Sequence, residues 1–172
     1  SMYSSIRNIL QIRGMKLSFE ILLIVFVFFA VKTYMQRDLV TGTPPSLSGT
    51  LLNGQTFDLA TYRGKPLLLH FWATWCSICK LEENNIAELS KNFQVLTVAM
   101  NSGTAKGIEQ YLHKQAISFP VIIDADGLIA KRFGVTVVPT SFILDASGVI
   151  RFTEVGFTTD WGLKSRLWLA QD

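Results

Sequence analysis

The sequence predicts an α/β domain, in which a mixed central sheet carries helices on both faces, preceded by a single N-terminal transmembrane helix. From residue 47 onward, apolar runs of strand length alternate with segments of helical periodicity, and the last two strands form a hairpin. Near the N-terminus lies an apolar run about long enough to cross a bilayer, which takes roughly 20 residues. For a chain of 172 residues, one domain with an appendage is expected.

Residues 17–36 form the predicted transmembrane anchor, after a segment, 1–16, that we expect in the cytoplasm. The basic residues Arg7, Arg13 and Lys16 precede the span, which favours a cytoplasmic N-terminus. A cleaved signal peptide and a buried helix are the alternatives. No small-x-small cleavage site follows the span and no polar face is visible, so we favour an uncleaved anchor in a bacterial cell membrane.

The anchor would place the rest of the chain on the periplasmic, extracytoplasmic side, where disulfides form and persist. This part consists of a predicted linker at 37–46, with Gly and Pro but no periodicity, and a domain at 47–172. The whole chain is 49% hydrophobic and 17% charged, which argues against disorder. Its net charge of +3 is small, and Lys and Arg do not cluster with aromatic residues, so nucleic acid is not an expected partner.

The first elements of the domain are predicted from turn residues and apolar spacing. Residues 51–57 are expected to form a hairpin, because an Asn-Gly pair at its centre favours the turn that matches strand twist. Residues 67–72 form a buried strand, since they are continuously apolar apart from His70. Residues 76–89 form a helix, because their apolar residues fall near helical spacing.

The later elements continue the alternation of strands and helices. Residues 93–100 are apolar at most positions and predict a second core strand, and residues 104–115 predict a helix with one apolar face. A short helix at 128–133 is closed by Gly134, a typical C-terminal cap. The remaining predicted elements are a short strand at 119–124, hairpin strands at 140–144 and 149–155, and a last helix at 159–169.

The two cysteines of the chain, Cys76 and Cys79, lie where a predicted strand passes into a predicted helix. A thiol reacts as the thiolate, and a helix N-terminus lowers the thiol pKa through its free N–H groups and its dipole. Two intervening residues place both sulfurs on one side of the turn. We therefore expect Cys76, at the more exposed position, to be the nucleophile and Cys79 to be the resolving thiol.

Two other uses of the cysteine pair are less favoured. A purely structural disulfide that closes so short a loop stabilises little. A zinc site needs more ligands than the chain offers, because it has no second cysteine pair and only His70 and His113. The position of the pair between strand and helix instead favours redox catalysis.

The segment 71–79, Phe-Trp-Ala-Thr-Trp-Cys-Ser-Ile-Cys, resembles the active-site signature of thioredoxin-like proteins. More narrowly it resembles the membrane-anchored TlpA/ResA/DsbE branch, and most closely the ScsD-like protein disulfide oxidoreductases, over residues 47–169. The resemblance implies a thioredoxin-like fold and disulfide exchange with protein substrates. It also implies a membrane redox partner that recharges the pair, and no metal or organic cofactor.

The resemblance also implies supporting residues around the cysteines. In the family, the proline at the position of Pro139 is cis and lies against the cysteine pair, which leaves the backbone of Val138 free to pair with an extended substrate segment. From the sequence alone, Pro139 is equally well a proline that opens a strand. Trp75 is expected to shield the disulfide and to offer a surface to the partner.

Two ionisable residues are candidates for proton handling. His70 stands where thioredoxin carries a buried acid, and it could take the proton of Cys79; the alternative is a hydrogen-bonded core histidine. Glu82 matches a glutamate of TlpA/ResA-like proteins one turn after the second cysteine, and could tune the cysteine pKa or take a proton; the alternative is a surface carboxylate. Glu83 and Glu88 are expected to be solvated.

The leading functional prediction is a membrane-tethered oxidoreductase, and two alternatives stay open. One is a reductase dedicated to cytochrome c maturation. The other is a copper-binding module, since a dithiol can hold Cu(I), although copper-binding relatives of this fold use a longer cysteine spacing and an added His. Ser77-Ile78 between the cysteines and Asn84 replace prolines that are common in the family, so the direction of electron flow does not follow from the resemblance.

Overall fold

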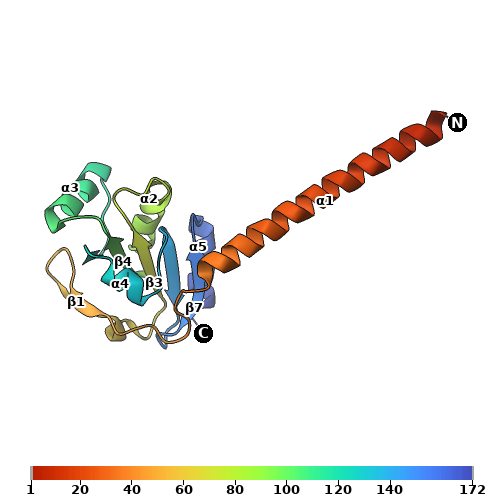
Figure 1. Cartoon of the computed structure of the whole chain (residues 1–172). Helices are drawn as coiled ribbons and strands as arrows, with labels where there is room; N and C mark the ends of the chain where they lie inside the picture. Colours follow the sequence, from red (N-terminus) through yellow and green to blue (C-terminus); the bar gives the residue numbers. More distant parts are fainter. Residues whose placement is uncertain (1, 172) are drawn as a thin grey trace. The chain divides into compact units, whose positions relative to one another are not determined.

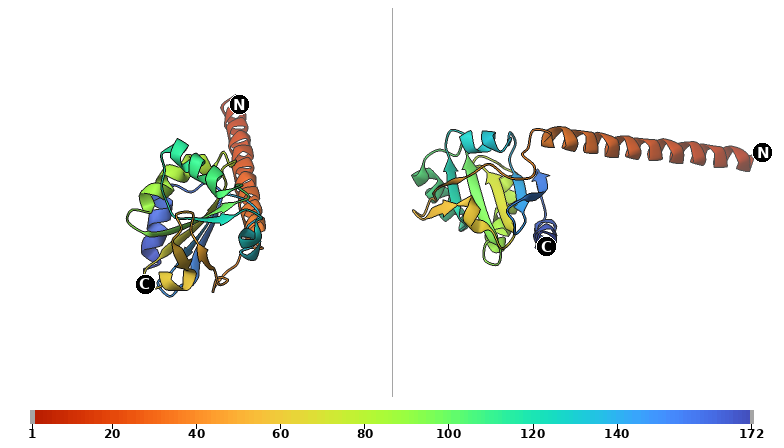
Figure 2. Two further views of the ribbon diagram at one scale, coloured as in Figure 1. Left: turned by 90° about the vertical axis from the view of Figure 1, so that its left-hand side faces the viewer. Right: turned by 90° about the horizontal axis from the view of Figure 1, so that it is seen from below.

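The computed structural model describes residues 2–171, with side chains from residue 14 onward (Figures 1 and 2). The chain divides into two compact units, residues 1–37 and residues 38–172.

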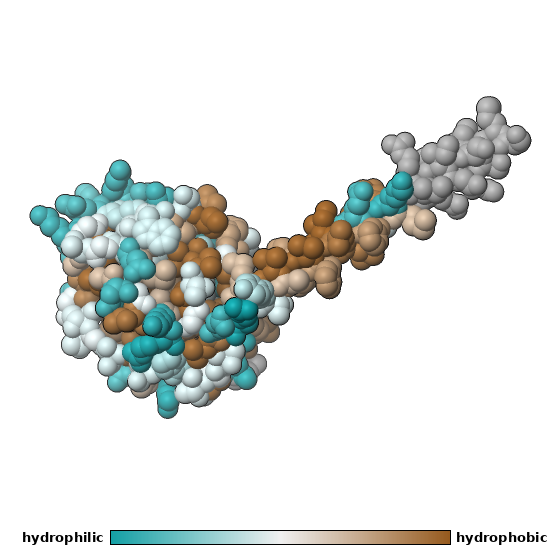
Figure 3. Space-filling view, viewed as in Figure 1, coloured by the Kyte–Doolittle hydropathy of each residue, from teal (hydrophilic) through white to brown (hydrophobic). Residues whose placement is uncertain are grey.

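The first unit is one helix, α1, Met2–Gln36. Its segment Gly14–Gln36, 23 residues, is long and apolar enough to cross a membrane. Figure 3 shows this apolar surface in brown. At 1.5 Å per residue such a helix is ~35 Å long, slightly more than the ~30 Å hydrocarbon core of a bilayer. The segment contains the predicted anchor, residues 17–36, and is a candidate membrane span.

The second unit is built on a five-stranded mixed sheet with the order β5-β4-β3-β6-β7. Strand β3 lies at its centre, parallel to β4 and antiparallel to β6, which explains why its residues are all buried. The predicted mixed sheet is therefore confirmed. The strands are β3 Leu67–Trp72, β4 Gln94–Met100, β5 Val121–Asp124, β6 Thr140–Leu144 and β7 Ile150–Val155.

Helices cover both faces of this sheet, as predicted (Figure 2). On one face, α2 and α5 pack through Ile86 and Leu163 onto Leu68 and Ile143 of the sheet. On the other face, α3 and α4 contribute residues to a larger core that contains Phe71 and Phe142. The helices are α2 Cys79–Leu89, α3 Ala105–Gln115, α4 Leu128–Arg132 and α5 Asp160–Leu169.

A small antiparallel hairpin precedes the main sheet. Its strands, β1 Ser48–Thr50 and β2 Thr56–Asp58, flank the predicted Asn53-Gly54 turn, where Gly54 has a φ of 85°. The hairpin is wider than the predicted range 51–57: its paired strands are residues 48–50 and 56–58, and residues 51–55 connect them. A 3-10 turn, η1 Leu59–Tyr62, leads toward β3.

The segment 37–46, predicted as a linker, is packed onto the domain from Asp38 onward. Leu39 is buried, the N–H of Val40 donates to the carbonyl of Phe133 at 3.1 Å, and the carbonyl of Gly42 accepts from the N–H of Ile150 at 2.8 Å. These backbone bonds attach the segment to the domain. Gly and Pro residues interrupt any periodicity here, which is why the sequence pattern predicts a linker.

Candidate active site

The two cysteines form a disulfide in the turn between β3 and α2. Helix α2 begins at Cys79, three residues later than predicted, so Cys76 lies in the turn ahead of the helix. The N–H of Cys79 donates to Sγ of Cys76 at 3.1 Å. In the reduced protein a free N–H at a helix N-terminus, aimed at this sulfur, favours the thiolate form. Cys76 is 6% exposed and Cys79 2%, so Cys76 is the more accessible of the pair.

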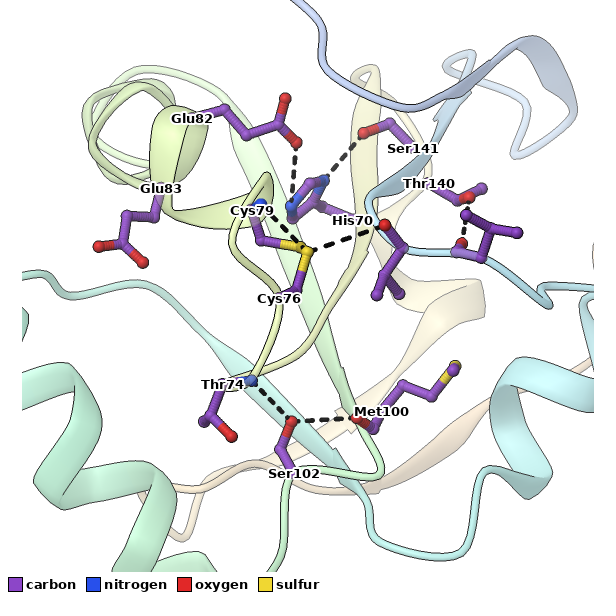
Figure 4. The surroundings of a disulfide bond; sticks show 12 residues. His70, Thr74, Cys76, Cys79, Glu82, Glu83, Met100, Ser102, Thr140 and Ser141 are labelled. Carbon is purple, nitrogen blue, oxygen red and sulfur yellow. Dashed lines mark hydrogen bonds and ion pairs between the residues drawn. A yellow bond between two sulfur atoms is a disulfide. The ribbon is translucent and has the colours of Figure 1, made fainter. Parts of the chain in front are cut away.

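The loop that follows strand β4 holds the active-site turn in place. The indole N–H of Trp75 donates to the carbonyl of Asn101 at 3.0 Å, and the N–H of Thr74 donates to Oγ of Ser102 at 3.0 Å. The Ser102 hydroxyl in turn donates to the carbonyl of Met100 (Figure 4). Trp75 is thereby fixed although it is 59% exposed. The sequence reasoning did not identify Asn101 and Ser102, although the carboxyl ends of adjacent parallel strands lie side by side.

A second loop, from Val137 to Thr140, lies against the disulfide. The carbonyl oxygen of Val138 is 3.7 Å from Sγ of Cys76, and the peptide bond between Val138 and Pro139 is cis. The hydroxyl of Thr140 donates to the carbonyl of Val137 at 2.7 Å. The carbonyl of Pro139 accepts from the N–H of Gly156 at 2.8 Å. The structure thus brings the predicted residues Val138 and Pro139 next to Cys76.

His70 and Glu82 meet behind the disulfide (Figure 4). Nδ1 of His70, on β3, lies 2.9 Å from Oγ of Ser141 on β6, and Nε2 lies 3.6 Å from Oε1 of Glu82 on α2. The other oxygen of Glu82 accepts the N–H of Thr158 at 2.9 Å. The structure therefore brings the two predicted proton-handling residues together. Ser141 and Thr158, which contact them, were not predicted.

Burial sets the protonation of these two side chains. It lowers the pKa of His70 to about 3, so the ring is neutral at physiological pH. It raises the pKa of Glu82 to about 7, although the hydrogen bond from Thr158 acts in the opposite direction. With a neutral imidazole, the contact between His70 and Glu82 is not an ion pair. Glu82 is thus a carboxyl group that can gain or lose a proton near neutral pH.

Glu83 was expected to be solvated, and this prediction is wrong. Its side chain is buried, with 7% of the residue exposed, and it accepts a hydrogen bond from the hydroxyl of Tyr111 at 2.7 Å. Burial and this bond raise the pKa of Tyr111. The bond ties α2 to α3, and Tyr111 also packs on Trp72 of β3, with ring centroids 5.6 Å apart. Glu88 is exposed beside Lys91, as expected.

Comparison with known proteins assigns the chain to a family. The model of the AhpC/TSA family matches residues 41–153, more than half of the chain. The chain belongs to this family. A thioredoxin-like protein of Haemophilus influenzae is 32% identical over 159 residues, covering 91% of this chain and 95% of the relative. The thiol-disulfide oxidoreductase ResA of Geobacillus thermodenitrificans is 32% identical, with 81% of each chain covered.

Solved structures agree with this assignment. A thiol:disulfide interchange protein of the thioredoxin family from Chlorobium tepidum superposes with a TM-score of 0.67 at 28% identity, over 77% of this chain and 98% of that one. StoA from Bacillus subtilis superposes with a TM-score of 0.61 at 25% identity, over 72% and 95%. The predicted thioredoxin-like fold is confirmed, and the chain is a thioredoxin-like thiol-disulfide oxidoreductase with its cysteine pair at Cys76 and Cys79.

Proposed function

We propose that this chain is a membrane-tethered oxidoreductase that exchanges disulfides with extracytoplasmic proteins, with Cys76 as the nucleophile and Cys79 as the resolving thiol. The observation that carries the proposal is the geometry at Cys76. Its sulfur is the more accessible of the two, faces a helix N-terminal N–H and lies 3.7 Å from the backbone carbonyl of Val138.

The exchange follows from the order of the two sulfurs. In the reducing direction, the Cys76 thiolate attacks a substrate disulfide, and one substrate sulfur leaves as a thiolate that takes up a proton. The Cys79 thiolate then attacks the Cys76 sulfur of the mixed disulfide. The Cys76–Cys79 bond forms and the second substrate thiolate is released. The oxidising direction is the reverse, and in either case a membrane redox partner restores the starting state.

The surface around Cys76 suits an extended polypeptide. The exposed apolar side chains Trp75, Ile78 and Val137 lie on the two loops that meet at the disulfide. The backbone of Val138 lies beside the same disulfide and can pair with an extended segment of the substrate. Apolar contact with a sheet-like backbone pairing supports a protein rather than a small thiol as the substrate.

The N-terminal helix supports membrane attachment. Residues 14–36 are predominantly apolar, and Arg7, Arg13 and Lys16, which precede the proposed anchor, favour a cytoplasmic N-terminus, which puts the cysteines on the opposite, periplasmic side. We propose residues 17–36 as the anchor and Asp38 as the start of the catalytic domain, which includes the segment 38–46.

The reduction of insulin by dithiothreitol tests the activity. The full chain in detergent micelles should accelerate the precipitation of insulin chains, and Cys76→Ser should abolish the acceleration because no mixed disulfide can form. Equal rates with and without the wild-type chain, or full activity of Cys76→Ser, would contradict the proposal.

The narrower alternative, a reductase dedicated to cytochrome c maturation, requires a reducing pair. A glutathione titration of the same chain measures the redox potential of the cysteine pair. A potential of about −270 mV fits such a reductase, whereas about −120 to −180 mV fits an oxidant or isomerase.

A further inference from the structure

The sheet face beneath α2 and α5 changes from apolar to polar toward the active site. Leu68 of β3 and Ile143 of β6 lie opposite each other and pack in the core. Two residues along each strand, His70 and Ser141 lie opposite each other on the same face, and both are buried. Packing alone would continue the apolar pair, so the imidazole and hydroxyl point to a chemical role.

Because His70 is neutral, only one of its two ring nitrogens carries a hydrogen, and the neighbouring groups determine which one. An ionised Glu82 only accepts hydrogen bonds, so the ring nitrogen that faces it at 3.6 Å, Nε2, carries the hydrogen. Nδ1 is then an acceptor, and the hydroxyl of Ser141 donates to it at 2.9 Å. The carboxylate of Glu82 consequently lies between two N–H groups, the Nε2–H of His70 and the backbone N–H of Thr158.

We propose that His70 is a positioning residue for the resolving step: its Nε2–H, in the tautomer that the Ser141 hydroxyl supports by donating to Nδ1, holds Glu82 as the carboxylate that takes the proton of Cys79. This inference rests on the proposed function. Cys79 and Glu82 are three residues apart in α2 and are therefore neighbours on its surface. At 3.6 Å the contact from His70 is longer than a hydrogen bond, and catalytic contacts often tighten during turnover.

The resolving step conserves protons and electrons. The S–H bond of Cys79 breaks, and an O–H bond forms on Glu82. The Cys79 thiolate attacks the Cys76 sulfur of the mixed disulfide, the Cys76–Cys79 bond forms, and the partner sulfur leaves with the electron pair of the broken bond. That thiolate takes a proton from solvent, and Glu82 later returns its own proton to solvent or to Cys79 on reduction.

The other ionisable groups around the pair have partners of their own. Glu154 lies opposite Ser141 in the register of β7 and pairs with Arg166 of α5 at 2.7 Å. A substitution of His70 leaves these contacts in place, so its effect can be assigned to Glu82 and the cysteines. On the helices that pack against the sheet, Glu83 of α2 is bonded to Tyr111 of α3, Asp160 is paired with Lys164 within α5, and Lys80 of α2 lies over the Tyr111 ring.

A rapid-mixing experiment separates the two chemical steps. The reduced full chain, in detergent micelles, is mixed with one equivalent of 5,5′-dithiobis(2-nitrobenzoate), which releases one coloured thiolate as Cys76 attacks and a second as Cys79 resolves. In His70→Leu the carboxylate loses an N–H donor, so Glu82 stays protonated to higher pH. The rate of the second phase should fall about tenfold at neutral pH. When this rate is measured as a function of pH, the midpoint of its rise should move up by about one pH unit. The first phase should change less than about twofold.

Matched variants decide the outcome. His70→Gln keeps an N–H donor and should retain most of the second-phase rate, and Ser141→Ala should shift the midpoint upward as His70→Leu does, which serves if His70→Leu does not fold. Glu83→Gln, on the same helix but bonded to Tyr111, should leave the midpoint unchanged. An unshifted midpoint in both His70→Leu and Ser141→Ala, or an equal shift in Glu83→Gln, would overturn the role of His70. A wild-type chain that shows no second phase would instead overturn the proposed function.

Discussion

At the scale of single residues, the neighbours Glu82 and Glu83 show how surroundings decide the role of a carboxylate. Both are buried, yet Glu82 meets His70 and the N–H of Thr158, whereas Glu83 accepts the hydroxyl of Tyr111. The pKa of Glu82 is raised to about 7. Only the family resemblance distinguishes the two residues in the sequence, because the partners that decide their roles are distant along the chain.

The raised pKa of Glu82 predicts a pH-dependent stability. An acid whose pKa rises on folding binds more protons in the folded state, so its contribution to stability is lost as pH rises from about 4.5 to about 7. Glu82→Gln removes this loss. The unfolding free energy of the variant minus that of wild type should therefore rise by up to about 3 kcal/mol as the pH increases across that range.

Urea unfolding of the full chain in detergent, followed by tryptophan fluorescence at several pH values, measures this difference. Exposed Glu88, changed to Gln, is the control and should give a difference that does not vary with pH. A Glu82→Gln difference that is equally flat would show that Glu82 titrates at its ordinary pKa.

At the scale of elements, the end of α4 and the segment after α1 depend on each other. Gly134 follows the helix with a φ of 71°, as expected of a C-terminal cap. The structure adds a reason that the sequence could not supply: a Cβ at this position would lie 1.8 Å from the carbonyl oxygen of Asp38. The glycine therefore also allows residues 38–46 to pack against the domain.

Gly134→Ala should destabilise the domain by several kcal/mol, because left-handed strain of about 1–2 kcal/mol adds to a backbone clash that costs about 1–3 kcal/mol. Gly54→Ala is a matched control: its φ of 85° imposes the same strain, but nothing lies within 4 Å of the added Cβ. Thermal unfolding of both variants compares the two costs. Equal losses would mean that the segment beginning at Asp38 does not pack against Gly134.

At the scale of the whole molecule, the sequence predicts the fold well because its evidence is local. The alternation of strands and helices, the Asn-Gly turn and the cysteine pair at a strand–helix junction are each contained in short segments. The contacts that complete the site are not local. His70 meets Ser141 across 71 positions and Glu82 meets Thr158 across 76, so only strand pairing and helix packing reveal them.

Contacts between distant parts of the chain also explain the packing of residues 38–46 and the presence of Asn101 and Ser102 at the active site, which the sequence did not predict. The packing of residues 38–46 depends on Phe133 and Ile150, which are distant in the chain. Ser102 and Asn101 reach the active site because β4 is the parallel neighbour of β3, an adjacency that follows from topology and not from any motif.

Trapping the mixed disulfide shows whether Cys76 attacks and Cys79 resolves. Reduced full-length Cys79→Ala, incubated with an oxidised protein substrate and analysed by mass spectrometry after proteolysis, should hold the substrate in a stable one-to-one disulfide through Cys76. The reciprocal variant, Cys76→Ala, should trap little, since Cys79 is only 2% exposed. Equal trapping through Cys79, or none through Cys76, would show that Cys76 is not the attacking thiol.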